Sequence, residues 1–142
     1  MANYYGLTRT NYFEVTDPDK LRDIVNRINW DCDDNFFDED HGSFAFGCYG
    51  TICGLFGSED ADNDDSDDEY EAEAVYEALQ EIVAPDSAII ITEVGYEKLR
   101  YLVGCAVIIT HNAIEYEDIH DQSLKTARRL LGNPNFTTDN FS

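Results

Sequence analysis

The chain has 142 residues, a length that fits one domain with a substantial buried core. Its 30 Asp and Glu residues against 9 Lys and Arg residues give a formal net charge of -21, which argues against binding to nucleic acid or to an anionic membrane, because both polyanions would repel the protein. With 43% hydrophobic residues, the chain is too apolar for an acidic disordered segment. We therefore expect one folded acidic domain over residues 1–142.

The N-terminal third predicts strands around one helix. Thr8 to Val15 is rich in β-branched and aromatic residues and predicts a strand. Asp17 and Pro18 then begin a helix, as N-cap and first-turn proline. Its apolar face has four residues at helical spacing, Leu21, Ile24, Val25 and Ile28. Residues 30–40 predict a short strand followed by an acidic turn, and residues 43–49 predict another strand.

The middle of the chain predicts an acidic loop and a second helix. Residues 58–70 are a low-complexity acidic loop, and a helical pattern starts at Glu71. One stripe of that helix is apolar, Val75, Leu79, Ile82 and Val83. A second stripe carries Glu69, Glu73, Glu77 and Glu81, with no Lys or Arg to offset them, which destabilises a helix by about 0.2 to 0.5 kcal/mol per pair. Pro85 ends the helix.

The last third predicts a hairpin, an edge strand and a third helix. Residues 88–94 and 98–110 pair around Gly95 and Tyr96, and residues 102–109, apolar on both faces, indicate a central strand. Residues 114–116 add an edge strand. The apolar positions of the third helix are Leu124, Ala127, Leu130 and Leu131, before a Gly132 C-cap and a short tail, residues 133–142. The order β-α-β-β-α-β-β-α predicts an α+β fold, with about three helices packed on a mixed, mainly antiparallel sheet.

The chain's N-terminus and cysteines indicate a cytoplasmic protein. Residues 1–5 lack the basic flank and apolar stretch of a secretory signal. The longest apolar run, residues 102–109, is far shorter than the about 20 residues of a membrane-spanning helix. Four cysteines are expected to be reduced thiols, Cys32, Cys48, Cys53 and Cys105.

The acidic residues are concentrated in one part of the chain. Residues 28–97 contain 21 Asp and Glu residues and no Lys or Arg, whereas the other 9 acidic residues balance all 9 basic ones. The sequence thus describes a neutral framework that carries one anionic segment. We expect these carboxylates to bind a basic partner: Asp31, Asp33, Asp34, Asp38, Glu39, Asp40, Glu59, Asp60, Asp62, Asp64, Asp65, Asp67, Asp68, Glu69, Glu73, Glu77 and Glu81.

The acidic loop also has a partial resemblance to a calcium loop. Asp60, Asp62, Asp64, Ser66, Asp68 and Glu71 occupy positions 1, 3, 5, 7, 9 and 12 of an EF-hand spacing. The position that requires glycine is Asp65, the normally apolar position is Asp67, and residues 54–57 do not form a preceding helix. A charge run explains this spacing better than a calcium site does, and we predict no metal.

Other polar residues do not indicate catalysis. A zinc site from Cys32, His41, Cys48 and Cys53 would lack a paired C-x-x-C knuckle. His111 and His120 lie near carboxylates in the sequence, but no nucleophile, phosphate loop or triad accompanies them. We therefore expect neither an enzyme nor a cofactor.

Two short stretches resemble motifs of small uncharacterised proteins from bacterial plasmids and phages. They are residues 10–15 (TNYFEV) with Asp17, and residues 93–101 (EVGYEKLRY). In composition the chain also resembles the DNA-mimic anti-restriction and anti-CRISPR proteins of mobile elements. This resemblance implies a counter-defence role.

The leading hypothesis is a non-catalytic DNA-mimic inhibitor that binds the basic nucleic-acid groove of a bacterial defence complex. Twenty-one carboxylates match the charge of about 36 Å of duplex DNA, at one charge per about 1.7 Å. An immunity protein or antitoxin that neutralises a basic nuclease toxin would use the same electrostatics. A calcium-binding module is the third alternative. The sequence leaves the oligomeric state open.

Overall fold

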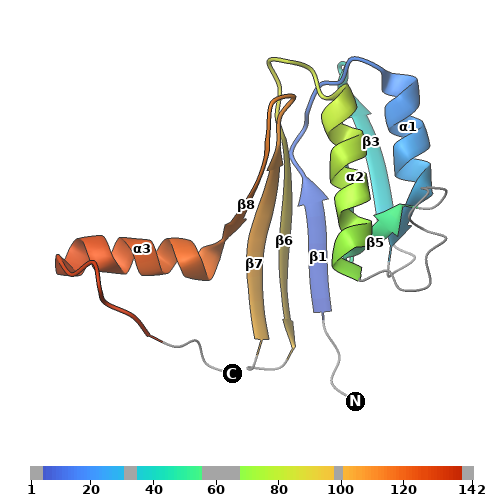
Figure 1. Ribbon diagram of the computed structural model, residues 1–142. Coiled ribbons are helices and arrows are strands. Elements are labelled where there is room, and N and C mark those ends of the chain that lie inside the picture. Colours follow the sequence, from blue (N-terminus) through green and yellow to red (C-terminus); the bar gives the residue numbers. More distant parts are fainter. Residues whose placement is uncertain (1–4, 31–34, 56–67, 98–100, 139–142) are drawn as a thin grey trace.

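A six-stranded antiparallel sheet with two helices on one face organises the chain (Figure 1). The computed structural model describes residues 5–30, 35–55, 68–97 and 101–138. The elements are β1 (Tyr5–Thr10), α1 (Pro18–Arg27), β2 (Ile28–Trp30), β3 (Asn35–Asp40), β4 (Ser43–Cys48), β5 (Ile52–Leu55), α2 (Asp68–Ile82), β6 (Ile89–Glu97), β7 (Tyr101–Ile109), β8 (Ile114–Asp118) and α3 (Ile119–Leu131). The predicted α+β class and mainly antiparallel sheet are confirmed.

The strand order of the main sheet is β3-β4-β1-β6-β7-β8, so the two edges are formed by β3 and β8. A separate two-stranded ribbon, β2-β5, packs against α2. The register places Thr8 of β1 opposite Cys48 on one side and Glu93 on the other. These three side chains share the face of the sheet that α1 and α2 cover, which we call the inner face. The opposite face is the outer face.

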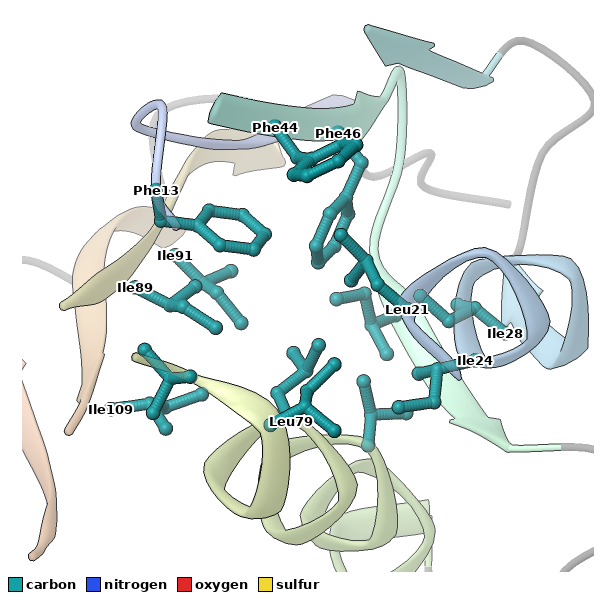
Figure 2. Packing of buried hydrophobic residues seen from close by; sticks show 14 of the residues in the cluster. Phe13, Leu21, Ile24, Ile28, Phe44, Phe46, Leu79, Ile89, Ile91 and Ile109 are labelled. Carbon is teal, nitrogen blue, oxygen red and sulfur yellow. The ribbon is translucent and has the colours of Figure 1, made fainter. Parts of the chain in front are cut away.

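The hydrophobic core lies between the inner face and the two helices, as Figure 2 shows. The helices contribute Leu21, Ile24, Val75, Leu79 and Ile82. Facing them, the main sheet contributes Phe44, Phe46, Ile89, Ile91, Val107 and Ile109, and the loop after β1 contributes Phe13. The rings of Phe13 and Phe46 meet edge to face at 6.0 Å between centroids, an arrangement that stabilises aromatic pairs beyond their burial.

The first helix begins and packs as predicted. The Asp17 carboxylate accepts a hydrogen bond from the Lys20 backbone N–H at 3.1 Å, which satisfies one of the free donors of the first turn. Leu21 and Ile24 are completely buried. The Arg22 guanidinium lies 5.7 Å from the centroid of the Phe44 ring, so α1 also contacts β4 through a cation–π interaction.

The predicted strand over residues 8–15 is wrong at both ends, because β1 begins at Tyr5 and ends at Thr10. The side chain of Asn11 accepts a hydrogen bond from the Ile90 N–H at 2.8 Å and donates to the Ala88 carbonyl at 3.0 Å. An asparagine side chain thereby takes the place of backbone in the ladder. The chain then leaves β6 and forms an isolated bridge between Phe13 and Phe44.

The predicted acidic turn within residues 30–40 is also wrong. Residues 35–40 form the edge strand β3, which pairs with β4 from Asn35–Cys48 to Asp40–Ser43. The turn lies at His41 and Gly42, with φ of 52° and 87°. Two consecutive positive φ values are the geometry of the two-residue hairpin turn that matches strand twist. One side of β3 carries Phe36, Asp38 and Asp40 and the other carries Asn35, Phe37 and Glu39, so the sequence lacks the alternation of apolar and polar residues that marks a strand.

The hairpin of β6 and β7 turns later than the sequence indicated. Gly95 and Tyr96, the predicted turn, lie within β6 and pair with Val103 and Leu102. On its other side β6 pairs with β1 as far as Tyr5 and Tyr96, whose rings lie 5.6 Å apart. This second partner keeps the strand extended, and the pairing of β6 with β7 continues to Glu97 and Tyr101.

The two remaining helices follow the predicted apolar patterns. Val75, Leu79, Ile82 and Val83 are all buried, although α2 starts at Asp68 and not at Glu71. The predicted acidic loop otherwise lies outside the described residues. In α3, Gly132 is the C-cap with φ of 66°. Figure 1 shows that α3 projects sideways from the sheet, and none of its residues, all of which are described, is buried. The prediction that about three helices pack on the sheet is therefore wrong for α3 and holds for α1 and α2.

Truncation of Leu79 tests the core. Leu79→Ala removes a completely buried side chain from the centre of the helix–sheet interface and should lower the free energy of unfolding by about 2 to 5 kcal/mol. Urea denaturation measures this change. The matched control is Glu77→Ala on the exposed side of the same helix, which should change stability by about 0.5 kcal/mol or less. Equal losses for the two variants would contradict the packing described here.

Candidate functional site

The predicted partner-binding carboxylates of residues 38–40 lie on the edge strand β3. Alternation along the strand directs Asp38 and Asp40 to the outer face and Glu39 to the inner face. Asp38 accepts a hydrogen bond from the Tyr12 hydroxyl at 2.6 Å, and this bond is the main cause of the raised pKa of Tyr12. Glu39 forms an ion pair with Arg22 at 3.2 Å. The outer pair is therefore positioned on a hydrogen-bonded hairpin.

A second group of predicted carboxylates lies on α2. Glu73 and Glu77 are exposed, and their negative charges contribute to the raised pKa of Tyr116 on β8, after burial as the main cause. Glu81 forms an ion pair with Lys20 of α1 at 3.2 Å. The prediction that no basic residue offsets the glutamate stripe is thus wrong at its last position, because helix packing brings α1 beside α2.

The basic residues of α1 are matched by nearby carboxylates. Lys20 pairs with Glu81, Arg22 pairs with both Asp19 and Glu39, and Arg27 pairs with Asp23. Each of these exposed pairs contributes at most about 1 kcal/mol to stability. Their larger effect is on the surface potential, because they leave the positive charges of α1 neutralised and the carboxylates of residues 28–97 in excess.

The two groups of carboxylates lie toward opposite edges of the sheet. Five strand spacings of about 4.8 Å separate β3 from β8, or roughly 24 Å. Asp38 and Asp40 lie at the first edge, and Glu73 and Glu77 face Tyr116 of the second. The backbone of Asp68 and Glu69 belongs to α2. The other predicted acidic residues lie outside the described residues: Asp31, Asp33, Asp34, Glu59, Asp60, Asp62, Asp64, Asp65 and Asp67.

Beneath α2 the structure assembles a half-buried polar cluster that the sequence reasoning missed. Glu93 of β6 accepts a hydrogen bond from the Thr51 hydroxyl at 2.7 Å. Burial, with smaller contributions from Tyr116 and Glu93, raises the pKa of Tyr76 to about 12. Burial also raises the pKa of the Cys105 thiol, so this cysteine is protonated at neutral pH and is a poor nucleophile. The sequence signal for this cluster was Glu93, which follows Ile89 and Ile91 at the alternating positions of β6 that point to the inner face.

Of the four residues considered for a zinc site, the structure describes the side chains of Cys48 and His41, and it places them in different surroundings. Cys48 is buried with a free thiol, whereas His41 is exposed in the β3–β4 turn beside Asp40. Cys32 and the side chain of Cys53 lie outside the described residues. Within the described ranges, no group of three or more His, Cys, Asp or Glu residues could hold a metal ion. His120 donates from Nε2 to the Leu102 carbonyl at 2.9 Å, a structural contact.

Comparisons with known proteins found no matching family model, no similar curated sequence and no similar solved structure. In the part of the chain that the structure describes, no helix has the length and apolar character needed to cross a membrane.

The polar cluster predicts a loss of stability at alkaline pH. Because folding raises the pKa of Tyr76 from 10.0 to about 12, the folded protein keeps a proton that the unfolded chain has released. The stabilisation is complete below about pH 10 and is lost as the pH rises through about 12. Tyr76→Phe removes the ionisable hydroxyl and should reduce the loss between about pH 9.5 and 11.5 by roughly 1 kcal/mol, less than the full pKa difference because the ring is only partly buried.

Urea denaturation across that pH range measures the effect. The control is Tyr49→Phe, which changes a tyrosine with 71% of its surface exposed and should follow the parent. Parallel pH profiles for the parent and Tyr76→Phe would show that this hydroxyl is not desolvated.

Proposed function

We propose that the protein is a non-catalytic DNA-mimic inhibitor from a mobile element, acting in the cytoplasm of a bacterial host on the basic nucleic-acid groove of a restriction or CRISPR complex. The observation that supports this proposal is the segregation of charge. Residues 28–97 carry 21 carboxylates and no basic residue, while the basic residues of α1 are matched by carboxylates of α1, α2 and β3.

The separation of the two carboxylate groups suits a groove. Asp38 and Asp40 point to the outer face at the β3 edge, whereas Glu73 and Glu77 lie on α2, on the other side of the sheet and toward β8, a strand roughly 24 Å from β3. Charges on two sides of the domain can meet basic residues on both walls of a groove that encloses it. Asp38 and Asp40 are held on a hairpin, and Glu73 and Glu77 are held on a helix. Inhibition by mimicry needs fixed charges of this kind, and no bond has to be made or broken.

The proposal predicts that exposed carboxylates, and not net charge alone, determine binding. The double variants Asp38→Asn/Asp40→Asn and Glu73→Gln/Glu77→Gln should each weaken binding to the inhibited complex by about 3- to 30-fold, at roughly 0.3 to 1 kcal/mol per exposed charge. The matched control is Glu14→Gln/Asp86→Asn, which removes the same charge from exposed positions outside both groups and should bind like the parent.

The measurement is competition with labelled duplex DNA for a panel of purified restriction endonucleases, CRISPR effector complexes and basic nuclease toxins. Failure of the parent protein to displace DNA from any complex at stoichiometric concentration would exclude the mimic. Inhibition confined to a toxin would favour the immunity-protein alternative.

Binding should also weaken with salt. Exposed carboxylates act through Coulomb attraction that mobile ions screen, with a screening length that falls from about 10 Å at 0.1 M salt to about 3 Å at 1 M. The affinity for the inhibited complex should therefore fall at least about tenfold between about 50 and 500 mM NaCl, mainly through slower association. Surface plasmon resonance measures both rates. An affinity independent of salt would remove the electrostatic mechanism.

A further inference from the structure

The helix α3 is amphipathic, yet it lies outside the core. Its apolar side includes Leu124, Ala127, Leu130 and Leu131, and the last two are 74% and 61% exposed. It is capped at both ends but has only 13 residues, and an isolated helix of that length is marginal in water unless its apolar face packs against something. An exposed apolar stripe on such a helix indicates a docking partner.

The start of α3 is anchored so that the rest of the helix points away from the sheet. Asp118 caps the first turn by accepting hydrogen bonds from the backbone N–H groups of His120 and Asp121 at 2.8 and 3.3 Å. The His120 ring donates to the Leu102 carbonyl of β7 at 2.9 Å. Ile119 lies over Gly104, where an added Cβ would come within 2.8 Å of its side chain. These contacts fix the direction of the helix at its base (Figure 1).

The outer face of the sheet presents a second exposed apolar surface. The register aligns Leu7, Val94 and Gly104 across β1, β6 and β7, and aligns Tyr5, Tyr96 and Leu102 one pair further along. Both helices of the core cover the opposite face. Val94, Tyr96, Tyr5 and Leu102 are 48%, 51%, 57% and 60% exposed, and Ile90 on the same face is 39% exposed. We call Tyr5, Leu7, Ile90, Val94, Tyr96 and Leu102 the outer apolar face.

We propose that the outer apolar face is the docking site for α3 of a second copy of this chain, so that two copies exchange helices in a symmetric dimer. The dimensions agree. A helix of 13 residues is about 20 Å long and about 10 Å wide. The stretch of β6 from Ile90 to Tyr96 is also about 20 Å long, and the three strands β1, β6 and β7 span about 10 Å between the outer two.

Charge complementarity identifies the partner as a second copy. The α3 segment carries Lys125, Arg128 and Arg129 against Asp121, a net charge of +2. Because the whole chain has a net charge of -21, the rest of the chain has a net charge of -23. The three basic residues line a concavity at the tip of α3 with Gly132 and Pro134. Glu115 and Glu117 lie on the outer face of β8, next to β7. A docked helix therefore brings its basic residues beside the carboxylates of β8, although Arg9 of β1, opposite Thr92, also lies on the outer face.

The exchange forms two equivalent contacts. Each docked helix covers about 20 Å by 10 Å of the outer face, so each copy supplies both a helix and a docking surface to the interface. Twofold symmetry makes both contacts identical and closes the assembly at two copies. The docking surface uses none of the carboxylates assigned to the basic partner, so the dimer does not depend on the proposed function.

Analytical ultracentrifugation of the full chain tests the dimer. The parent should sediment as a dimer at micromolar concentration, and the dimer should persist at about 500 mM NaCl because its contacts are mainly apolar. Two variants are compared: the arm variant Leu130→Gln/Leu131→Gln, which changes the exchanged helix α3 (the arm), and the face variant Val94→Gln/Leu102→Gln, which changes the outer apolar face. Both leave the net charge unchanged, and each should raise the dissociation constant of the dimer about 100-fold or more. The control Tyr49→Gln alters an exposed residue outside both surfaces and should remain dimeric.

Mixing the two variants distinguishes helix exchange from other dimers. The face variant retains an intact arm and the arm variant retains an intact face, so their mixture can form one complete contact and should give a heterodimer that neither variant gives as a homodimer. Packing of arm on arm or of sheet on sheet predicts no such rescue. A monomeric parent at 100 µM, dimeric arm variants, or a mixture that stays monomeric would each overturn the proposal. Circular dichroism of each variant confirms that it is folded.

Discussion

The apolar contact between the inner face of the sheet and the helices α1 and α2 holds this structure together against its own charge. A chain with a net charge of -21 repels itself when compact, and the ion pairs of α1 are exposed and individually weak. The burial of apolar side chains has to supply the stabilisation that offsets this repulsion. It does so through completely buried residues such as Leu21, Leu79 and Phe46, packed in one continuous layer. The acidic segment can therefore be carried at the edges of the fold.

The same layered arrangement explains where charge is tolerated. Both edges of the sheet carry carboxylates that point to the outer face, Asp38 and Asp40 on β3 and Glu115 and Glu117 on β8. Charged edge strands oppose pairing with another sheet. Carboxylates at these positions therefore protect the monomer fold, and under the proposed function Asp38 and Asp40 also meet a basic partner. On β1, β6 and β7 the outer face carries exposed apolar side chains such as Val94, Tyr96 and Leu102, with Arg9 and Thr92 between them.

The acidic edges and the outer apolar face suit different partners, which separates the two proposals physically. Attraction between exposed charges extends over several ångströms and is screened by salt, whereas apolar contact is short-ranged and insensitive to it. In a dimer with exchanged helices, the carboxylates of α2 would lie on the opposite side of each sheet from the docked helix. Two copies could then present two sets of carboxylates to one target, and linked binding of this kind increases the apparent affinity without new contacts.

The sequence by itself determined the local features whose cause is local. Helix caps, apolar stripes and breakers depend on a few neighbouring residues, so Asp17, Gly132 and the buried stripe of α2 were predicted correctly, as was the α+β class. The strand predicted over residues 43–49 is β4, which ends one residue earlier, at Cys48. Tertiary structure decided what depends on a distant partner. Asn11 ends β1 because it reaches the backbone of residues 88 and 90, Gly95 stays extended because β1 pairs beside it, and Glu81 meets Lys20 because two helices pack together. The sequence pattern also could not reveal that one side of β7, which is apolar on both sides, is not covered by the core helices. An apolar residue gives the same pattern whether a helix of its own chain or of another chain covers it.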